Sequence, residues 1–272
     1  MQKTLYISDL DGTLLNPSAQ LSENSINIIN NIIRAGGLFT YATARSFSSA
    51  SPITAPLRLN LPLATYNGAF FVEPDIGKFL AKAEFKREHT TQLLQQLKES
   101  GIFPLAYSVI DGLERVSYIS DYISPGVEAY VHSRMGDRRL RPVSNFAELH
   151  EGEIFYFTII GEKEELWPLV QAVASNPDIN HNFQMDTYSS DYWLEIYPCE
   201  ASKQRAVQWL KQYTGADRVV CFGDNINDIP MFQAADEGYA VENACDELKA
   251  VATGIIPANT EDGVARWLEE NL

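Results

Sequence analysis

Short apolar runs alternate with amphipathic stretches in the first and last parts of the chain, a pattern typical of strands that alternate with helices. The apolar runs predict strands at Thr4–Leu10, Leu38–Thr43, Leu63–Tyr66, Arg218–Phe222 and Tyr239–Val241. Helices are predicted at Ser22–Ala35, Ala201–Tyr213, Ile226–Ala235, Cys245–Ala252 and Asp262–Glu270, with a short Ser-rich helix or loop at Ser46–Ala55. Ser22 is a suitable N-cap for the first helix. Alternation of this kind predicts a parallel sheet with helices on both faces.

The middle of the chain has a different pattern, in which strand-length runs follow one another with few helices between them. Strands are predicted at Phe79–Phe85, Leu105–Ile110, Glu114–Ile119, Ile154–Ile160, Phe183–Thr187 and Trp193–Tyr197, and helices at Arg87–Ser100 and Glu162–Ala174. Asp111-Gly112 between two of these runs is a hairpin signal. We therefore expect an α/β core domain formed by residues 1–78 and 198–272, interrupted by an inserted α+β domain at residues 79–197.

The net charge of the chain disfavours two classes of binding partner. The chain has 272 residues and a formal net charge of −15, which argues against non-specific binding of nucleic acid or of an anionic membrane. Cys199, Cys221 and Cys245 are far apart in sequence, which favours reduced, mostly packing cysteines. No apolar run is long enough to span a membrane and no signal-peptide pattern is present, so we expect a soluble, cytoplasmic protein.

Two aspartates stand close together where the first predicted strand ends, in the run Ser8-Asp9-Leu10-Asp11-Gly12-Thr13-Leu14. Side chains two positions apart on a strand point to the same face, so Asp9 and Asp11 are expected to project together. Two carboxylates about 4 Å apart repel by roughly 4 kcal/mol at an effective dielectric constant of 20, and a cation or a shared proton offsets this repulsion. The pair therefore indicates a metal or acid–base site, and the alternative is an Asp-Gly surface turn.

A second acidic motif, Gly223-Asp224-Asn225-Ile226-Asn227-Asp228, follows the strand predicted at Arg218–Phe222. Open α/β sheets bind ligands at the carboxyl ends of their strands, and both acidic motifs would lie at such ends. A carboxylate cluster without His or Cys favours a hard cation such as Mg2+. The alternative is a Gly-Asp-Asn turn that caps the next helix.

Two further polar residues lie at the ends of predicted elements. Thr43 ends the second strand, and a hydroxyl beside backbone N–H groups at a strand–helix loop can hold a phosphate. An ordinary helix cap is the alternative for Thr43. Lys203 lies at the start of the helix that follows the insert, where the helix dipole disfavours a cation. This conflict hints that Lys203 neutralises phosphate charge, and the alternative is a solvated lysine.

These four stretches occur in the order of the four motifs of the haloacid dehalogenase (HAD) superfamily of phosphotransferases. Asp9-Leu10-Asp11-Gly12-Thr13 resembles its D-x-D-G-T motif, and Gly223–Asp228 resembles its G-D-x-x-N-D motif. Thr43 and Lys203 stand at the places of its second and third motifs. Over nearly the full chain the arrangement is similar to the Cof-like hydrolases of subclass IIB. The resemblance implies a Rossmann-like parallel-sheet core domain with an inserted α+β cap of the C2B type.

The resemblance also implies an activity: Mg2+-dependent hydrolysis of small phosphorylated metabolites, especially sugar phosphates, through an aspartyl-phosphate. Asp9 would be the nucleophile and Asp11 the general acid and base. Mg2+ would be held by Asp9, the backbone carbonyl of Asp11 and Asp224, while Asp228 would bind it through water or orient a ligand. The phosphoryl oxygens would be bound by the side chains of Thr43, Lys203 and Asn227 and the backbone N–H groups of Leu10 and Ala44.

Two positions depart from the pattern of the group, which usually has Gly where this chain has Ala44 and Glu242. An alanine keeps the N–H that would bind phosphate, so Ala44 is compatible with this role. Glu242 could change what the mouth of the site accepts.

Three alternatives share parts of this chemistry. A phosphomutase of the same superfamily would return the phosphoryl group to a sugar. A non-catalytic phospho-receiver also uses acidic residues, a Thr and a Lys, but it needs neither a second acid two residues after the nucleophile nor a large cap. A phosphate-binding protein with a decayed site is disfavoured because all the polar motif residues are present. The expected partner is a small phosphorylated metabolite, bound by a monomer or a small homo-oligomer.

Overall fold

The computed structural model describes residues 2–185 and 190–272, and the chain folds into two compact units. Met1–Lys82 and Ala201–Leu272 together form the core unit, and Ala83–Glu200 forms the cap unit. The last two residues of the strand predicted at Phe183–Thr187 lie outside the described residues. No helix of the described ranges is both long and apolar enough to cross a bilayer.

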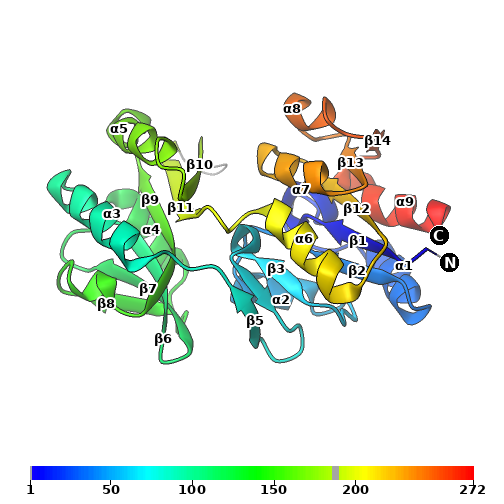
Figure 1. Ribbon diagram of the computed structural model, residues 1–272, viewed down its shortest axis with the longest axis horizontal. Helices are drawn as coiled ribbons and strands as arrows, with labels where there is room; N and C mark the ends of the chain where they lie inside the picture. The colour runs from blue at the N-terminus through cyan, green and yellow to red at the C-terminus, as the bar shows by residue number, and fades with distance from the viewer. Residues whose placement is uncertain (1, 186–189) are drawn as a thin grey trace. The chain divides into compact units, whose positions relative to one another are not determined.

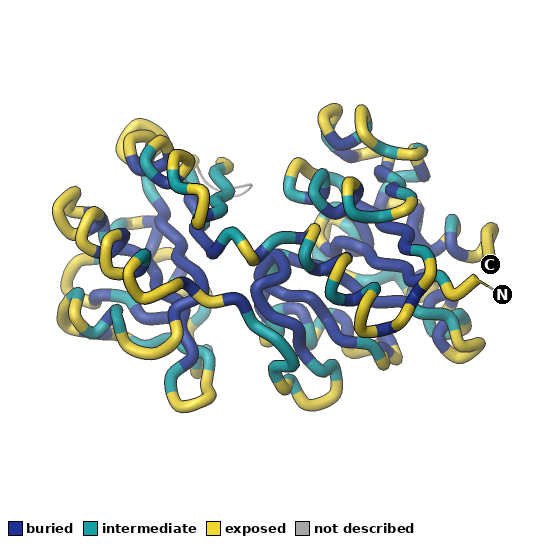
Figure 2. The backbone as a smooth tube through the Cα atoms, viewed as in Figure 1, coloured by how far each residue is buried: buried dark blue, intermediate teal, exposed yellow. Residues whose placement is uncertain are grey.

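A five-stranded parallel sheet forms the centre of the core unit (Figure 1). Its strand order is β14-β13-β12-β1-β2, with β1 at Thr4–Ser8, β2 at Leu38–Tyr41, β12 at Arg218–Gly223, β13 at Glu237–Val241 and β14 at Gly254–Ile256. Leu5, Ile7, Val219 and Val220 are fully buried, as expected for inner strands that are covered on both faces. Figure 2 shows these inner strands as the buried centre of the unit.

Helices pack in pairs on this sheet. α1 (Glu23–Arg34) packs beside α9 (Gly263–Asn271), and α6 (Lys203–Thr214) packs beside α7 (Ile229–Ala234). Because the chain crosses from β1 to β2 in one direction and from β12 to β13 in the other, right-handed crossovers place α1 and α7 on opposite faces. The remaining helices of the unit that the structure describes include α2 (Phe47–Thr54) and α8 (Asp246–Lys249). The predicted N-cap is confirmed, since the side chain of Ser22 accepts from the Ser25 N–H at 2.9 Å.

A small antiparallel sheet extends the core unit and consists of β3 (Leu63–Thr65), β4 (Phe70–Val72) and β5 (Phe79–Lys82). A parallel bridge between Ala42 and Ala64 ties it to the end of β2. The run Phe79–Phe85 was expected to begin the inserted domain, but its first half pairs with β4 instead. The physical reason is local packing, because the rings of Phe70 and Phe79 lie 4.6 Å apart between their centroids.

The cap unit is built on a six-stranded sheet of order β10-β11-β9-β6-β7-β8, in which only β7 and β8 are paired in parallel. The strands are β6 (Leu105–Ile110), β7 (Leu113–Ile119), β8 (Leu140–Val143), β9 (Glu153–Gly161), β10 (Ile179–Met185) and β11 (Tyr192–Pro198). Helices α3 (Arg87–Glu99) and α5 (Lys163–Ala174) bury leucines against one face of this sheet. The predicted hairpin is confirmed, because Asp111 and Gly112 have φ of 52° and 76° between β6 and β7.

Among the strands and α-helices of the described residues, those not predicted are β4, α4 (Pro125–Ser133), β8 and β14. β8 contains Pro142, a poor strand former, and it is held by its parallel pairing with β7. β4 and β14 have three residues each, too few to establish a period. β4, β8 and β14 depend on neighbours that the local sequence does not reveal, whereas α4 begins with local signals, Ser124 as N-cap and Pro125 in its first turn.

Candidate active site

The first acidic motif leaves β1 in a tight turn that is built directly on the end of β12. The backbone N–H of Asp9 donates to the carbonyl oxygen of Phe222 at 2.9 Å. Gly12 has a φ of +75°, and a Cβ atom at this position would overlap the carboxylate of Asp224. The hydroxyl of Thr13 donates to Oδ1 of Asp224 at 2.8 Å. The D-x-D-G-T turn is therefore shaped to approach the second acidic motif.

Three carboxylates meet at the carboxyl ends of β1 and β12. Oxygen atoms of Asp9, Asp224 and Asp228 all lie within 4.8 Å of one another. Nζ of Lys203 lies 2.9 Å from Oδ1 of Asp9 and 2.5 Å from Oδ1 of Asp228. Lys203 is only 2% exposed although it begins α6, so it is not a solvated lysine. Asp9, Asp224, Asp228 and Lys203 thus converge in a largely buried group of three acids and one base.

Burial and neighbouring charges shift the pKa values of Asp9, Asp224 and Lys203. Burial raises the pKa of Asp9 well above its usual range, and the carboxylates of Asp228 and Asp224 raise it further against the opposing effect of Lys203. Burial, assisted by Asp228, also raises the pKa of Asp224 to about 6. Burial alone would lower the pKa of Lys203, but the charges of Asp228 and Asp9 outweigh it and raise that pKa. One ammonium group therefore does not fully compensate the three carboxylates.

Asp228 is held more firmly than the other acids. Its Oδ2 accepts from the backbone N–H groups of Asp224 at 2.9 Å and Asn225 at 3.0 Å, while its Oδ1 faces Lys203. A Cβ atom at Gly223 would lie 2.7 Å from this side chain, so the backbone approaches it closely. These contacts suit Asp228 for orienting Lys203 and the loop.

Asp11 does not join the cluster, which differs from the expectation that Asp9 and Asp11 project together. Nε and Nη2 of Arg45 donate to its two carboxylate oxygens at 2.7 and 2.6 Å, and the Asp11 side chain is 52% exposed. The strand β1 ends at Ser8, and Gly12 turns the chain with a positive φ. The alternation of side chains along a strand therefore stops before it reaches Asp11.

The remaining predicted residues lie in the loops around the cluster. Thr43 is fully buried at the end of β2, and its Oγ1 accepts from the N–H of Arg45 at 3.1 Å. Ala44 is half-buried and Leu10 is fully buried. The Nδ2 group of Asn227 donates to Oδ1 of Asn67 at 3.4 Å. Within the part of the chain that the structure describes, the buried Oδ1 atom of Asn227 has no hydrogen-bond partner.

The donor set fits a magnesium ion. Hard divalent cations prefer oxygen ligands, and Asp9 and Asp224 offer carboxylate oxygens with raised pKa values that a cation would stabilise in the ionised form. The buried Oδ1 atom of Asn227 nearby would accept from a water molecule or a hydroxyl group.

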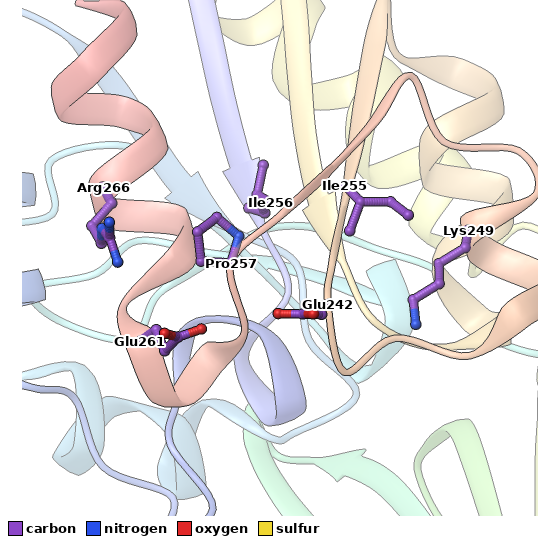
Figure 3. Close-up of a pocket in the computed structure, with 7 residues that line it drawn as sticks. All are labelled: Glu242, Lys249, Ile255, Ile256, Pro257, Glu261 and Arg266. Carbon is purple, nitrogen blue, oxygen red and sulfur yellow. The ribbon is translucent and has the colours of Figure 1, made fainter.

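Glu242 lies apart from this cluster, in a pocket of the core unit that is shown in Figure 3. The pocket is lined by Glu242, Lys249, Ile255, Ile256, Pro257, Glu261 and Arg266. Figure 3 shows the Glu242 carboxylate between Glu261 and Lys249, so charges of both signs share this space. The next residue, Asn243, supports the first motif by donating from Nδ2 to the carbonyl of Gly12 at 2.8 Å.

A scan against family models matches residues 6–268 to the haloacid dehalogenase-like hydrolases. This chain is a haloacid dehalogenase-like hydrolase. The family covers almost the whole sequence, which confirms the resemblance drawn from the four motifs and the expectation of a hydrolase that acts on phosphoric monoesters. The parallel-sheet core predicted for the fold is confirmed by the strand order described above.

Two curated relatives of this hydrolase carry phosphatase names. The 5-amino-6-(5-phospho-D-ribitylamino)uracil phosphatase of Bacillus subtilis is 29% identical, and the alignment covers 98% of this chain and 96% of that protein. The pyridoxal phosphate phosphatase of Escherichia coli is 27% identical with 97% of each chain covered. A solved haloacid dehalogenase-like hydrolase from Bacteroides thetaiotaomicron shares the fold, with a TM-score of 0.82, 23% identity and 100% of both chains covered.

Three residues of the site carried no role in the sequence analysis: Thr13, Arg45 and Asn67. Thr13 belongs to the first motif, and its hydrogen bond to Asp224 depends on how that motif folds. Arg45 is two residues after Thr43, which is the one signal that could have placed it near the site. Asn67-Gly68-Ala69 resembles a loop of the Cof-like hydrolases, but the contact of Asn67 with Asn227 depends on the tertiary structure.

Proposed function

We propose that this hydrolase is a Mg2+-dependent phosphatase of small phosphorylated metabolites that works through an aspartyl-phosphate at Asp9. The observation that carries the proposal is the position of Asp9, buried at the end of β1 with Lys203 at 2.9 Å and two further carboxylates beside it. A carboxylate in such surroundings is oriented by its neighbours and removed from bulk water, as a nucleophile requires.

In the first step, a carboxylate oxygen of Asp9 attacks phosphorus and the bond from phosphorus to the ester oxygen breaks. The leaving oxygen takes a proton from Asp11, which acts as the general acid. In this structure Asp11 is bound to Arg45, so it must leave that ion pair to reach the leaving group. The products of this step are an alcohol and an acyl phosphate on Asp9.

In the second step, a water molecule occupies the place of the released alcohol and hydrolyses the acyl phosphate on Asp9. Asp11, now ionised, takes a proton from the water molecule, which attacks phosphorus and releases inorganic phosphate and the Asp9 carboxylate. Asp11 is 52% exposed, so water and solvent protons can reach it. Both steps return Asp9 and Asp11 to their starting protonation states.

Charge neutralisation supports both steps. Mg2+, held by Asp9, Asp224 and the backbone carbonyl of Asp11, would supply positive charge that stabilises the transferring phosphoryl group. Lys203 provides a buried ammonium group beside Asp9, and the hydroxyl of Thr43 and the amide of Asn227 would contact the phosphoryl oxygens. The N–H groups of Leu10 and Ala44 complete the proposed phosphate site.

The substrate class is proposed from the two named relatives. One acts by name on a phosphorylated ribityl compound and the other on pyridoxal phosphate, and both are small phosphorylated molecules. Sugar phosphates, sugar-alcohol phosphates and phosphorylated cofactors are therefore the compounds to test. Because function is determined by the site and not by the fold, the panel should contain all three classes.

The decisive experiment measures release of inorganic phosphate from this panel, with Mg2+ and with EDTA, for the wild type and for Asp9→Asn. We expect release that requires both Mg2+ and Asp9. Turnover above a few per cent in Asp9→Asn would show that Asp9 is not the nucleophile. Transfer of the phosphoryl group within a sugar phosphate, without release, would identify a phosphomutase and overturn the phosphatase proposal.

A further inference from the structure

Three consecutive residues after β3 have a left-handed backbone. The φ angles are 50° for Tyr66, 54° for Asn67 and 87° for Gly68. This conformation is natural for glycine and tolerated by asparagine, but a bulky tyrosine disfavours it because Cβ crowds the backbone. Such strain persists only where surrounding contacts impose it, and it concentrates at functional sites.

The first contacts that impose this conformation come from the loop of Thr43, which is the second of the four family motifs. The N–H of Tyr66 donates to the carbonyl of Arg45 at 3.0 Å, and the N–H of Asn67 donates to the carbonyl of Thr43 at 2.9 Å. The two bonds lie on either side of Ala44. The turn therefore fixes the backbone of the loop that carries Thr43 and Ala44.

The same turn packs against the third motif. A Cβ atom at Gly68 would overlap the carbonyl oxygen of Ser202, the N-cap of α6, so only glycine fits here. Nη1 of Arg205 donates to the carbonyl of Gly68 at 3.3 Å. Lys203 lies between Ser202 and Arg205 in sequence. The turn therefore supports the start of α6, from which the Lys203 side chain extends.

The fourth motif meets the turn through a side chain. Asn67 is 2% exposed, and its Oδ1 accepts from Nδ2 of Asn227 at 3.4 Å. This hydrogen bond sets the direction of the Asn227 amide, whose other polar atom is buried. A single strained turn thus contacts the loops of Thr43, Lys203 and Asn227.

We propose that Asn67 is a positioning residue, which aligns Asn227 and the Thr43 loop for a phosphoryl group. The proposal rests on the function proposed above, because it concerns the same phosphate site. Asn67 acts through its neighbours: its amide directs the Asn227 side chain, and its N–H fixes the carbonyl of Thr43. The strain at Tyr66 and Asn67 is the cost of placing these groups.

The test replaces Asn67 by glycine, which keeps the left-handed backbone and removes only the amide. We expect Asn67→Gly to bind inorganic phosphate in the presence of Mg2+ about tenfold more weakly than the wild type, as measured by calorimetry, because the hydrogen bond to Asn227 is lost. The value of kcat/KM should fall by a similar factor, while the urea midpoint changes little. Ala19→Gly is the matched control, since Ala19 has a φ of 54° in another turn of the core unit.

A double-mutant cycle separates positioning from a merely structural role. If Asn67 acts through Asn227, the variant with both Asn67→Gly and Asn227→Ala should bind phosphate no more weakly than Asn227→Ala alone. Additive losses, or an unchanged affinity in Asn67→Gly, would overturn the proposal. If the wild type binds phosphate but hydrolyses none of the panel, the proposed phosphatase function fails, and the phosphate affinities alone decide the role of Asn67.

Discussion

Arg45 donates to both carboxylate oxygens of Asp11, through Nε at 2.7 Å and through Nη2 at 2.6 Å. Asp9, two residues earlier, instead lies in a buried cluster beside Lys203. Two acids of one short motif therefore have different environments, as a nucleophile and an acid–base residue require. Asp11 can reach a leaving group only after it separates from Arg45.

The different environments of Asp9 and Asp11 predict the behaviour of Asp11→Asn. The variant should lose about 10²- to 10⁴-fold in kcat on alkyl phosphates, which need a protonated leaving group. On p-nitrophenyl phosphate, whose leaving group needs little protonation, formation of the aspartyl-phosphate should persist as a burst. Stopped-flow absorbance measures that burst. Because the Asp11 carboxylate is not in the acidic cluster, the Mg2+ affinity of the variant should match that of the wild type, and a large loss of affinity would contradict the assigned role.

Removal of Lys203 should destabilise the fold as well as abolish activity. Lys203→Met leaves Asp9 and Asp228 buried without their ammonium partner, and breaking such a pair costs about 3–5 kcal/mol. Urea unfolding near neutral pH measures this loss. Lys211→Met on the same helix is the control, because its ion pair with Asp236 is exposed and should contribute less than about 1 kcal/mol. Equal effects of the two variants would contradict the buried-pair interpretation.

The raised pKa of Asp224 predicts how stability depends on pH. Asp224 has a pKa of about 6 in the folded protein against an ordinary value of 3.8, so the folded state holds the extra proton between these values. This residue's contribution to the free energy of unfolding therefore falls as pH rises from about 4 to about 6 and stays low above that. A cation that binds the ionised cluster reverses the loss.

Thermal unfolding with and without Mg2+ tests this expectation. The rise in Tm that Mg2+ causes should be larger near pH 7 than near pH 5, because protons compete with the cation for Asp224 at the lower pH. Asp224→Asn should reduce the effect of Mg2+ at both pH values. A rise in Tm that is the same at both pH values in the wild type would show that Asp224 does not bind the ion.

Thr43 should act through its hydroxyl group alone. Thr43→Val keeps the shape of this fully buried side chain and should lower kcat/KM about 10- to 100-fold through weaker binding of the phosphoryl group. Thr43→Ser should stay within about threefold of the wild type. Thr40→Val is the control, because Thr40 is a buried threonine of β2, close to Thr43 in sequence, and its hydroxyl donates to the carbonyl of Pro62. A loss in Thr40→Val equal to that in Thr43→Val would implicate β2 packing.

The convergence of the acidic motifs could be predicted from the sequence because it follows from periodicity and topology. Apolar runs locate β1 and β12, and parallel strands bring their carboxyl ends to one edge, where Asp9 and Asp224 meet. For Lys203, its unfavourable place at a helix start indicated a role outside the helix, but its burial beside Asp9 and Asp228 emerged from the structure. These signals are local, and each has a direct geometric consequence.

The positions of Arg45 and Asn67 could not be predicted in the same way. The left-handed backbone of Tyr66 and Asn67 is imposed by tertiary hydrogen bonds, against the local preference of tyrosine. The direction of Asp11 was wrongly expected because the strand ends at Ser8, and the exact end of a strand is not encoded by alternation. β8 was missed because Arg141 and Pro142 become a strand only by pairing with β7.

The order of the strands in the core sheet also determines when the site can assemble during protein synthesis. β1 lies between β2 and β12, yet β12 is made only after the complete cap unit, Ala83–Glu200. Every strand that the structure describes in the cap sheet comes from that stretch, so the sheet can form on the ribosome first. Asp9 emerges early and has neither Lys203 nor Asp224 beside it until the last part of the chain appears. A ribosome-stalled chain that stops before β12 should therefore contain a folded cap and no phosphate site.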